Sequence, residues 1–485
     1  MENNTVSFHP HPLYIVSILR KMIFLLLAPL LRSIFSALSG GLNGWLQGAW
    51  LDILMVLLFF LCGAVIWYRF VITAGPEGFT VSRGILFRTN TCIPLNKCSC
   101  ITAIAPFYLK PFHAVRFRVD TPGGNIQKAD LALLLHQRSL EKILPLIGSV
   151  PLHDHRTKVY TPKNSYVLFL SAITSNSFAG VLMVSAFITQ AGNILGAEFA
   201  DQLYGTFEEA TRLLAFGIPP AAAALAYVLF FGWVLAFLFN AARHLNLKVR
   251  RNGSLLEITG GLLSPPRYLL SRQNIGFLDI RQTFLTYIFH LSSVFVYSVG
   301  YGKYRDELDA IIPYANRRHL KNRLSLLLPE FQLSSRQLSP AKNGLLHLPP
   351  LPYSTIALVF ALLCAFAGVY TLFPGWSPVI AWGFLFALAP ALWYLAVRTI
   401  DAFTCGVSYQ KHCYTLRYSK GFHLHTVLIM ENRISNVFTV QNIFQRVFGR
   451  CDLLVFSYTE GVRFHRIRNL PAKEAFSLFN PEKRK

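Results

Sequence analysis

The pattern of hydrophobic and polar positions alternates between two kinds of block, and this pair of blocks occurs three times along the chain. The first kind is a long apolar run. The second kind is rich in lysine and arginine, and its apolar residues recur at every second position. Long apolar runs predict membrane-spanning helices, and alternation at period two predicts half-buried strands. The repeat therefore predicts a membrane protein with three similar soluble modules, which favours a scaffold or binding protein over a single-site enzyme.

Five apolar runs are long enough to span a membrane, because a spanning helix needs about 20 mostly apolar residues. They are Ile53–Phe70, Tyr166–Gln190, Ile218–Asn240, Thr355–Phe373 and Val379–Val397. A sixth run, near the N-terminus, is interrupted by Arg20 and Lys21. We expect an interfacial helix over Leu13–Lys21 and then a short span from Met22 to about Leu38; the alternative is a helix that lies on the surface and never crosses. The chain is thus predicted to have about six transmembrane helices in three hairpins.

Lysine and arginine predict the orientation of these helices, since cytoplasmic loops carry the excess of both residues. The loops Ser39–Trp50 and Pro374–Pro378 contain neither residue, and Gly192–Gly217 contains only Arg212. The strand-like blocks carry nearly all the other lysines and arginines of the chain. We therefore expect both termini and all three modules on the cytoplasmic side of a bacterial inner membrane.

Each strand-like block is expected to fold as an α+β module, in which an antiparallel sheet is capped by a C-terminal helix. Each opens with an alternating strand that ends at a glycine turn; these strands are Phe79–Gly84, Leu255–Gly261 and Tyr414–Gly421. Each closes with an amphipathic helix; these helices are Gln137–Leu146, Ala315–Leu327 and Pro471–Phe479. The core candidates in the last block are Leu416, Ile434, Val437, Leu454 and Phe456.

The predicted boundaries divide the chain into six parts. They are 1–72 (interfacial helix and first helix pair), 73–150 (first module), 151–243 (second pair), 244–330 (second module), 331–398 (linker and third pair) and 399–485 (third module). The second and third modules align without a gap, so that identical residues coincide: Gln282 with Gln441, Phe289 with Phe448, and Ser298 with Ser457. Several strands followed by one helix is the order of a pleckstrin-homology (PH) fold.

Two segments of the third module carry a family resemblance. Glu431–Val437 followed by Gln441–Gly449 resembles the signature of bacterial PH-like domains in membrane proteins. The whole chain resembles the YdbT type of that family, with three modules that each follow a helix pair, and His11–Leu13 is similar to its N-terminal pattern. The first module departs from the signature at Cys98–Ile101 and Lys110–His113. The resemblance implies a fold and a membrane arrangement, and it implies no reaction.

Composition narrows the function classes. The chain has 485 residues, of which 53% are hydrophobic and 14% charged, with a formal net charge of +23. In a chain this apolar, the basic charge favours an anionic membrane surface over nucleic acid. The spacing of Cys92, Cys98, Cys100 and His113 fits no standard zinc site, and the sequence contains no phosphate loop or nucleophile elbow. We expect no metal, no cofactor and no enzymatic activity; the alternative is a transporter or lipid-handling protein with a pathway through the helices.

Two groups of polar residues are candidate binding sites. The first is a cluster in the third module, proposed for a protein partner: Asn432, Arg433, Gln441, Gln445 and Arg446. Its structural alternative is that these side chains bond turn backbone groups and that Arg446 pairs with an acid. The second group lies on predicted strands, where the arginines are expected to share one face and to contact lipid headgroups: Arg116, Arg118, Arg463, Arg466 and Arg468. Its alternative is the ordinary positive-inside bias. Membrane lipids and a protein are the expected partners, and the sequence leaves the oligomeric state open.

Overall fold

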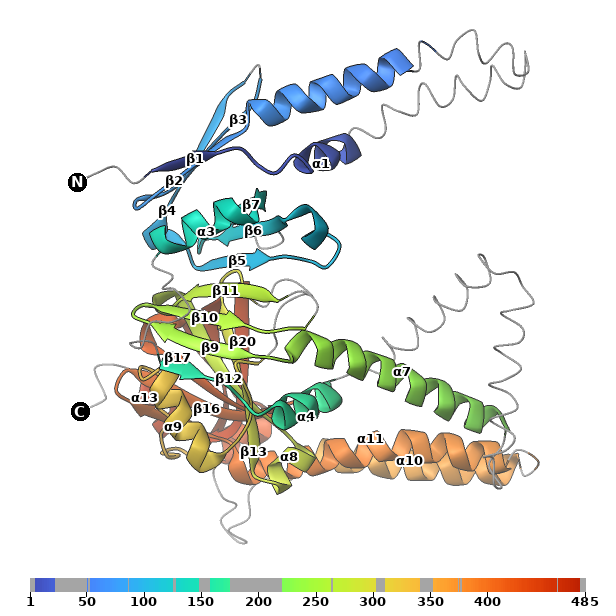
Figure 1. Ribbon diagram of the computed structural model, residues 1–485. Helices are drawn as coiled ribbons and strands as arrows, with labels where there is room; N and C mark the ends of the chain where they lie inside the picture. Colours follow the sequence, from blue (N-terminus) through green and yellow to red (C-terminus); the bar gives the residue numbers. More distant parts are fainter. Residues whose placement is uncertain are drawn as a thin grey trace. The chain divides into compact units, whose positions relative to one another are not determined.

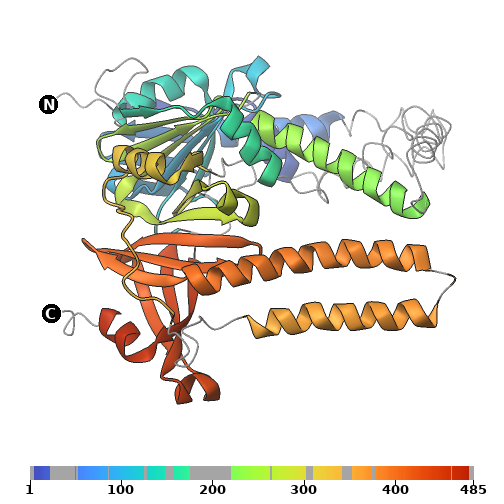
Figure 2. The same ribbon diagram turned by 90° about the horizontal axis from the view of Figure 1, so that it is seen from below.

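The computed structural model describes residues 5–21, 50, 53–85, 87–124, 128–147, 158–174, 220–262, 265–301, 310–340, 352–373, 375, 377–459 and 461–479 (Figures 1 and 2). The chain forms two compact units. Unit 1 comprises Met1–Thr157, Arg251–Ile258 and Leu263–Asn274, and unit 2 comprises Lys158–Arg250, Thr259–Leu262 and Ile275–Lys485. Each unit combines antiparallel sheets with helices.

The first sheet of unit 1 is antiparallel and has the order β1-β2-β3-β4. Its strands are β1 (Val6–Phe8), β2 (Val71–Gly75), β3 (Gly78–Arg83) and β4 (Thr89–Pro94). The helix α1 (Tyr14–Lys21) follows β1, and an apolar helix, Ile53–Tyr68, leads into β2. The alternation predicted from sequence is visible in β3, where Phe79 and Val81 are buried and Thr80 between them is exposed. A short 3₁₀ helix, η2 (Leu95–Lys97), ends this half of the module.

The second sheet of unit 1 joins strands from two modules. From the first module come β5 (Cys100–Ile104), β6 (Ala114–Asp120) and β7 (Leu131–His136), followed by α3 (Gln137–Leu146). From the second come β10 (Leu255–Thr259) and β11 (Pro266–Ser271). Here β11 pairs antiparallel with β5, and Leu269 lies opposite Ile101. Buried side chains from both modules share the core, in which the rings of Phe79 and Phe117 meet edge to face with centroids 5.5 Å apart.

A second sheet that joins strands from two modules lies in unit 2; it is antiparallel and has the order β14-β13-β12-β17-β16-β15. The second module supplies β12 (Ile275–Thr283), β13 (Leu291–Ser298) and β14 (Ile312–Asn316). The third supplies β15 (Gly406–Gln410), β16 (Cys413–Lys420) and β17 (His423–Met430). Two helices of the second module, α8 (Phe284–Ile288) and α9 (Arg317–Leu327), accompany its strands. The central pairing is β12 with β17, with Leu278 opposite Leu428.

The last sheet of unit 2 has the order β18-β19-β20. It contains β18 (Ile434–Val440), β19 (Arg450–Thr459) and β20 (Gly461–Pro471), with α12 (Ile443–Val447) between β18 and β19 and α13 (Ala472–Phe479) at the end. The amphipathic helix predicted over Pro471–Phe479 forms as α13, with Ala475 buried and Leu478 and Phe479 packed on the same core.

Two of the described helices are long and apolar enough to cross a membrane: Tyr353–Leu372, which is α10, and Gly383–Thr404 within α11 (Ser377–Thr404). They form an antiparallel pair in Figure 2. Shorter apolar helices cover Ile53–Tyr68, Asn164–Ile173 within α4 (Asn164–Thr174), and Val228–His244 within α7 (Pro220–His244). The predicted span from Met22 to Leu38 lies outside the described residues.

Two core predictions for the third module are wrong. Leu416 is fully buried as expected, and Ile434 and Val437 are half-buried against the same core. Leu454 and Phe456, however, are only half-buried, whereas their neighbours Leu453 and Val455 are 0% exposed. The residues Leu453–Phe456 are all apolar, so alternation of apolar and polar residues does not say which of them faces inward.

Candidate functional site

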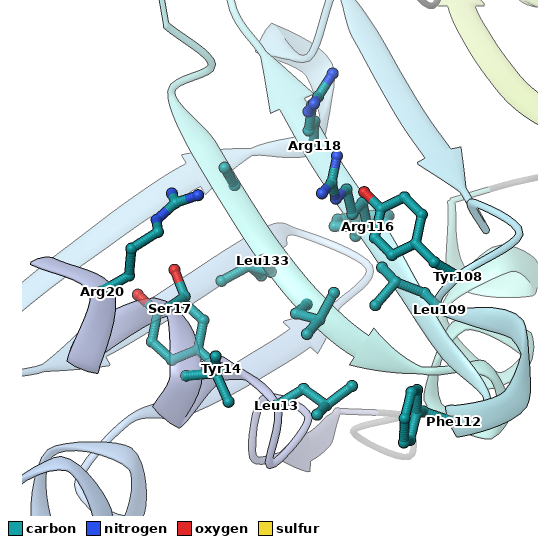
Figure 3. A pocket seen from close by; sticks show the side chains of 14 residues that line it. Leu13, Tyr14, Ser17, Arg20, Tyr108, Leu109, Phe112, Arg116, Arg118 and Leu133 are labelled. Carbon is teal, nitrogen blue, oxygen red and sulfur yellow. The ribbon is translucent and has the colours of Figure 1, made fainter. Parts of the chain in front are cut away.

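A hollow of about 630 Å³ lies on the first module, beside α1, β6 and β7 (Figure 3). Its lining comes from segments far apart in the sequence: the N-terminal helix, the turn before β6, and the two strands. The basic side chains that line it are Arg20, Arg116 and Arg118. None of the described residues that line it is acidic. Three positively charged side chains therefore line one hollow.

The alternation of β6 explains why two of these arginines lie together. Phe117 is 0% exposed in the core of unit 1, so its neighbours Arg116 and Arg118 project to the opposite face of the strand. Figure 3 shows both side chains rising from this strand, with Arg20 and Ser17 across from them on α1. The prediction that Arg116 and Arg118 share one face is confirmed. Arg20 was missed as a site residue because in the sequence it only interrupts an apolar run.

Aromatic and apolar side chains form the rest of the hollow. The guanidinium of Arg116 lies 5.5 Å from the ring centroid of Tyr108, a distance at which a cation attracts the face of an aromatic ring. Tyr14 packs edge to face against Phe70, with centroids 5.2 Å apart. Burial raises the pKa of the Tyr14 hydroxyl despite the nearby positive charge of Arg83. Tyr14 thus stays protonated at neutral pH and can act as a hydrogen-bond donor.

His11 holds the N-terminal segment against the hollow. The backbone N–H of Leu13 donates to Nδ1 of His11 at 3.1 Å, which leaves Nε2 as the ring nitrogen that can donate. That Nε2 lies 3.0 Å from the carbonyl oxygen of Phe112, which also lines the hollow. His11 is only 5% exposed. The His11–Leu13 pattern noted in the sequence therefore has a structural explanation, because it connects α1 to the turn before β6.

A second histidine lies against His11. The rings of His11 and His136 have centroids 4.1 Å apart. Burial lowers the pKa of His136, and the positive charges of His11, Arg138 and His113 lower it further. The ring contact and this lowered pKa both belong to the segment that joins the N-terminal residues to the end of β7.

The glutamines of the third-module cluster support a turn. Gln441 donates from Nε2 to the carbonyl oxygen of Arg450 at 2.6 Å. Gln445 donates to Asp452 at 2.7 Å, and its backbone N–H is capped by Asn442 at 2.7 Å. The second module makes the same bond from Gln282 to the carbonyl of Leu291, together with the same kind of cap. The structural interpretation therefore fits Gln441 and Gln445.

The other three members of this cluster are Asn432, Arg433 and Arg446. Asn432 and Arg446 are exposed, and Arg433 is half-buried. Beside Arg446, α12 exposes a group of large apolar side chains: Ile443 at 82%, Phe444 at 76%, Val447 at 77% and Phe448 at 66%. Asn432, Arg433 and Arg446 thus remain predicted partner contacts, and the apolar surface of α12 is a feature that the sequence analysis missed.

The basic strand of the third module differs from its prediction. The register of β20 places Arg463 on the same face as His465 and Ile467, both of which are buried. Arg466 and Arg468 lie at the alternate positions, so the five predicted arginines do not share one kind of face. Arg466 is also bound to Asp452, with Nη2 and Oδ2 2.7 Å apart. Arg463 lies on the other face of the strand from Arg466, because the two are three positions apart and side chains of a strand alternate between its faces at each position.

The chemistry of the hollow is that of anion binding. Guanidinium groups donate hydrogen bonds in a fork that matches phosphate and carboxylate oxygens. In the core of unit 1, burial raises the pKa of the Cys98 thiol to about 12, which keeps it a poor nucleophile. Within the described part of the chain, no group of three His, Cys, Asp or Glu side chains is placed to hold a metal ion.

Comparison with known proteins adds two relationships. The bacterial PH domain family matches residues 23–148, a range that includes Arg116 and Arg118. The UPF0699 transmembrane protein YdbT of Bacillus subtilis (strain 168) is 20% identical over 299 residues, which are 55% of this chain and 58% of that protein. The chain thus matches less than two thirds of the length of this curated relative. No solved structure matches the chain.

Proposed function

Since this chain is a bacterial PH-domain membrane protein of the YdbT type, we propose that it is a non-enzymatic inner-membrane scaffold whose first module binds an anionic lipid headgroup. In this proposal the chain crosses the membrane as three helical hairpins, and both termini and all three modules are cytoplasmic. Protein partners bind the exposed edge near Asn432, Arg433 and Arg446.

The observation that supports lipid binding best is the convergence of Arg20, Arg116 and Arg118 on one hollow that has no acidic side chain among its described lining residues. Each arginine near an anionic leaflet contributes about 1 kcal/mol of attraction. The apolar and aromatic lining can accommodate the glycerol and the first methylenes of a lipid, while the guanidinium groups bind its phosphate.

The test uses the purified full-length chain in detergent, titrated with short-chain phosphatidylglycerol. Replacing both Arg116 and Arg118 by Gln should weaken binding about tenfold to thirtyfold, as expected for two arginines at about 1 kcal/mol each. The matched control is the double variant Arg138→Gln with Lys142→Gln, because it removes the same two charges from exposed positions on α3 that do not line the hollow.

Two further ligands determine what is recognised. Short-chain phosphatidylcholine should bind more weakly than phosphatidylglycerol if net negative charge matters. Free glycerol phosphate should bind detectably only if the headgroup alone is sufficient. Equal losses of phosphatidylglycerol binding in the Arg116 and Arg118 variant and in the Arg138 and Lys142 variant would show that overall charge, and not the hollow, attracts the lipid.

A further inference from the structure

The three modules are joined by a repeated strand pairing. In each module the third strand is followed by a short 3₁₀ helix and then by the fourth strand; the third strands are β4, β11 and β17, and the fourth strands are β5, β12 and β18. The fourth strand of the first module pairs with β11 of the second, and the fourth strand of the second module pairs with β17 of the third. Both pairings are antiparallel, so each module completes the sheet of the one before it.

The two junctions also have the same register. Ile101 lies opposite Leu269, and Leu278 lies opposite Leu428. Each of the three fourth strands is followed by a residue with positive φ: His113, His290 and Gly449. Along the sequence, Ile101 is as far from His113 as Leu278 is from His290, and Val437 is at the same separation from Gly449. Leu269 and Leu428 precede their 3₁₀ helices by the same number of positions as Cys92 precedes η2. The repeat therefore identifies Val437 and Cys92 as the equivalent positions on β18 and β4.

These two strands lack the partner that their equivalents have. In the described part of the chain, β4 pairs with β3 alone and β18 pairs with β19 alone. Every residue of β5 and the first six of β12 are buried, whereas β18 has only Ile434 and Val437 half-buried and β4 has only Ile93 buried. Soluble proteins usually protect a sheet edge with charges or proline, but β18 contains neither.

Side chains beside β18 are uncovered as well. In the second module, Phe277 of β12 is buried in the core of the third module and meets His465 edge to face at 4.9 Å. On β18, the face equivalent to that of Phe277 carries Phe438, which is 50% exposed. Phe438 contacts Phe456, which lies near Phe464, and Phe464 is itself 52% exposed. A following module would cover this face.

The turn after the fourth strand shows the same difference. Phe284 at the start of α8 packs against Trp393 of α11, the apolar helix that precedes the third module, with centroids 5.7 Å apart. Its equivalent at the start of α12 is Ile443, which is 82% exposed. In the first module the helix that precedes the strands is Ile53–Tyr68, whose apolar side chains are largely exposed. The end of one copy thus exposes the surface that the beginning of another copy would cover.

We propose that copies of this chain associate head to tail, with β18 of one copy adding to β4 of the next in the register of the internal junctions. In this register Val437 lies opposite Cys92 and Phe438 lies opposite Thr91. The pairing is heterologous, so each copy keeps one edge available, and the assembly either closes into a ring or continues as a filament. Lipid binding by the arginine hollow is independent of this association.

The test places a cysteine opposite a natural one. Directly opposed residues of antiparallel strands have Cα atoms about 4.5–5.5 Å apart, within the range that a disulfide spans. The full-length Val437→Cys chain is expressed in membranes, with the accessible Cys62 and Cys364 replaced by alanine, and is oxidised with copper phenanthroline. A ladder of dimers, trimers and larger species on a non-reducing gel is expected, and Cys92→Ser should abolish it.

The controls determine register and partner. Val440→Cys lies three positions farther along β18 and should cross-link to Cys92 far less than Val437→Cys. A ladder that survives Cys92→Ser, a disulfide only within one chain, a product with a different protein alone, or equal cross-linking from Val440→Cys would each overturn the proposal. The arginine variants of the hollow should leave the ladder unchanged, which separates this test from the lipid test.

A second measurement does not need a cross-link. Phe438→Lys places a charge in the proposed contact and should reduce the mass of the detergent-solubilised assembly to that of one chain. Phe476→Lys is the matched control, because Phe476 is exposed on α13, and the equivalent helix positions, Glu141 and Lys321, stay exposed in the two modules that another module follows. The same mass for both variants, with the secondary structure of both intact, would overturn the proposal.

Discussion

β12 and β18 are equivalent strands in very different surroundings. Both have a register shift near their start, both run into a short helix with a capping box, and both precede a residue with positive φ, His290 in one case and Gly449 in the other. Yet β12 is largely buried and β18 is largely exposed. Local sequence thus determines the path of the strand, and the neighbouring module determines whether the strand is covered.

The side chains at equivalent positions of β12 and β18 also differ. On β12, Asp279 is buried, accepts a bond from Arg281 at 2.6 Å and lies 3.0 Å from Nδ1 of His425 on β17. Burial alone would raise the pKa of Asp279, but His425 and Arg281 keep it below its usual value. On β18 the corresponding residue is Phe438. A buried ionic contact therefore links the modules inside the chain, whereas an apolar surface is exposed at its end.

The largest effect should come from truncating the same position in the two strands. Leu278→Ala removes a side chain that is 0% exposed and should lower the free energy of unfolding by about 2–5 kcal/mol. Val437→Ala at the half-buried equivalent should cost about 1 kcal/mol or less in the dissociated chain. Denaturant unfolding in detergent measures both. Similar losses at low protein concentration would contradict the contrast between a covered and an uncovered strand.

Acidification should destabilise the junction between the second and third modules. His465 is 3% exposed, within hydrogen-bond distance of Tyr418 at 2.8 Å and Ser457 at 2.9 Å. Burial lowers its pKa to about 4, and the charges of His425, Lys420 and Arg463 add to this effect while Asp279 opposes it. The stabilisation from a neutral His465 is fully present above about pH 6.5, the unfolded value, and is lost as pH falls toward 4.

At pH 5 this loss amounts to about 2 kcal/mol, since each pH unit corresponds to about 1.4 kcal/mol. Thermal unfolding at pH 7.5 and pH 5 measures it. His423 contributes with the same sign, because burial lowers its pKa as well. The variant His465→Gln isolates the effect: it lowers stability at pH 7.5 but should show a flatter pH profile. An unchanged profile in this variant would assign the acid sensitivity to other groups.

The smallest predicted effect concerns the helix cap that follows both β12 and β18. Thr283 and Asn442 each accept a hydrogen bond from the backbone N–H three residues later, at 3.3 and 2.7 Å. Replacing either by alanine should cost about 1 kcal/mol, because one helix-end donor loses its partner. The comparison predicts equal losses at the covered and the uncovered strand. A much larger loss at Thr283 would show that the neighbouring module also supports the turn.

Features that depend on neighbours in sequence could be predicted from sequence. The bounds of α3 match the prediction, and β3, β10 and β16 lie within one or two residues of theirs. Arg116 and Arg118 were placed together correctly because one buried residue separates them. These features follow from residue periodicity and turn chemistry, which act over a few positions.

Features that depend on distant segments could not be predicted. The pairing of β5 with β11 joins residues more than a hundred positions apart, and no alternation pattern specifies which edges meet. Arg20 belongs to the hollow only because His11 holds the N-terminal segment against the turn before β6. The inward positions of β19 were missed because Leu453–Phe456 are apolar on both faces, and the outer face is the one that carries the exposed phenylalanines.

The identical register of the two internal junctions has an evolutionary consequence. A gene segment encoding one helix pair with its module can be duplicated or deleted without creating a mismatched edge, because each module carries the same donor strand and the same acceptor strand. If the second module and its helices were deleted, Ile101 of β5 would face Leu428 of β17, the residue that now faces Leu278. The number of modules in such proteins can therefore vary by whole units among lineages, and the strand-to-strand contact is the trait that selection must preserve.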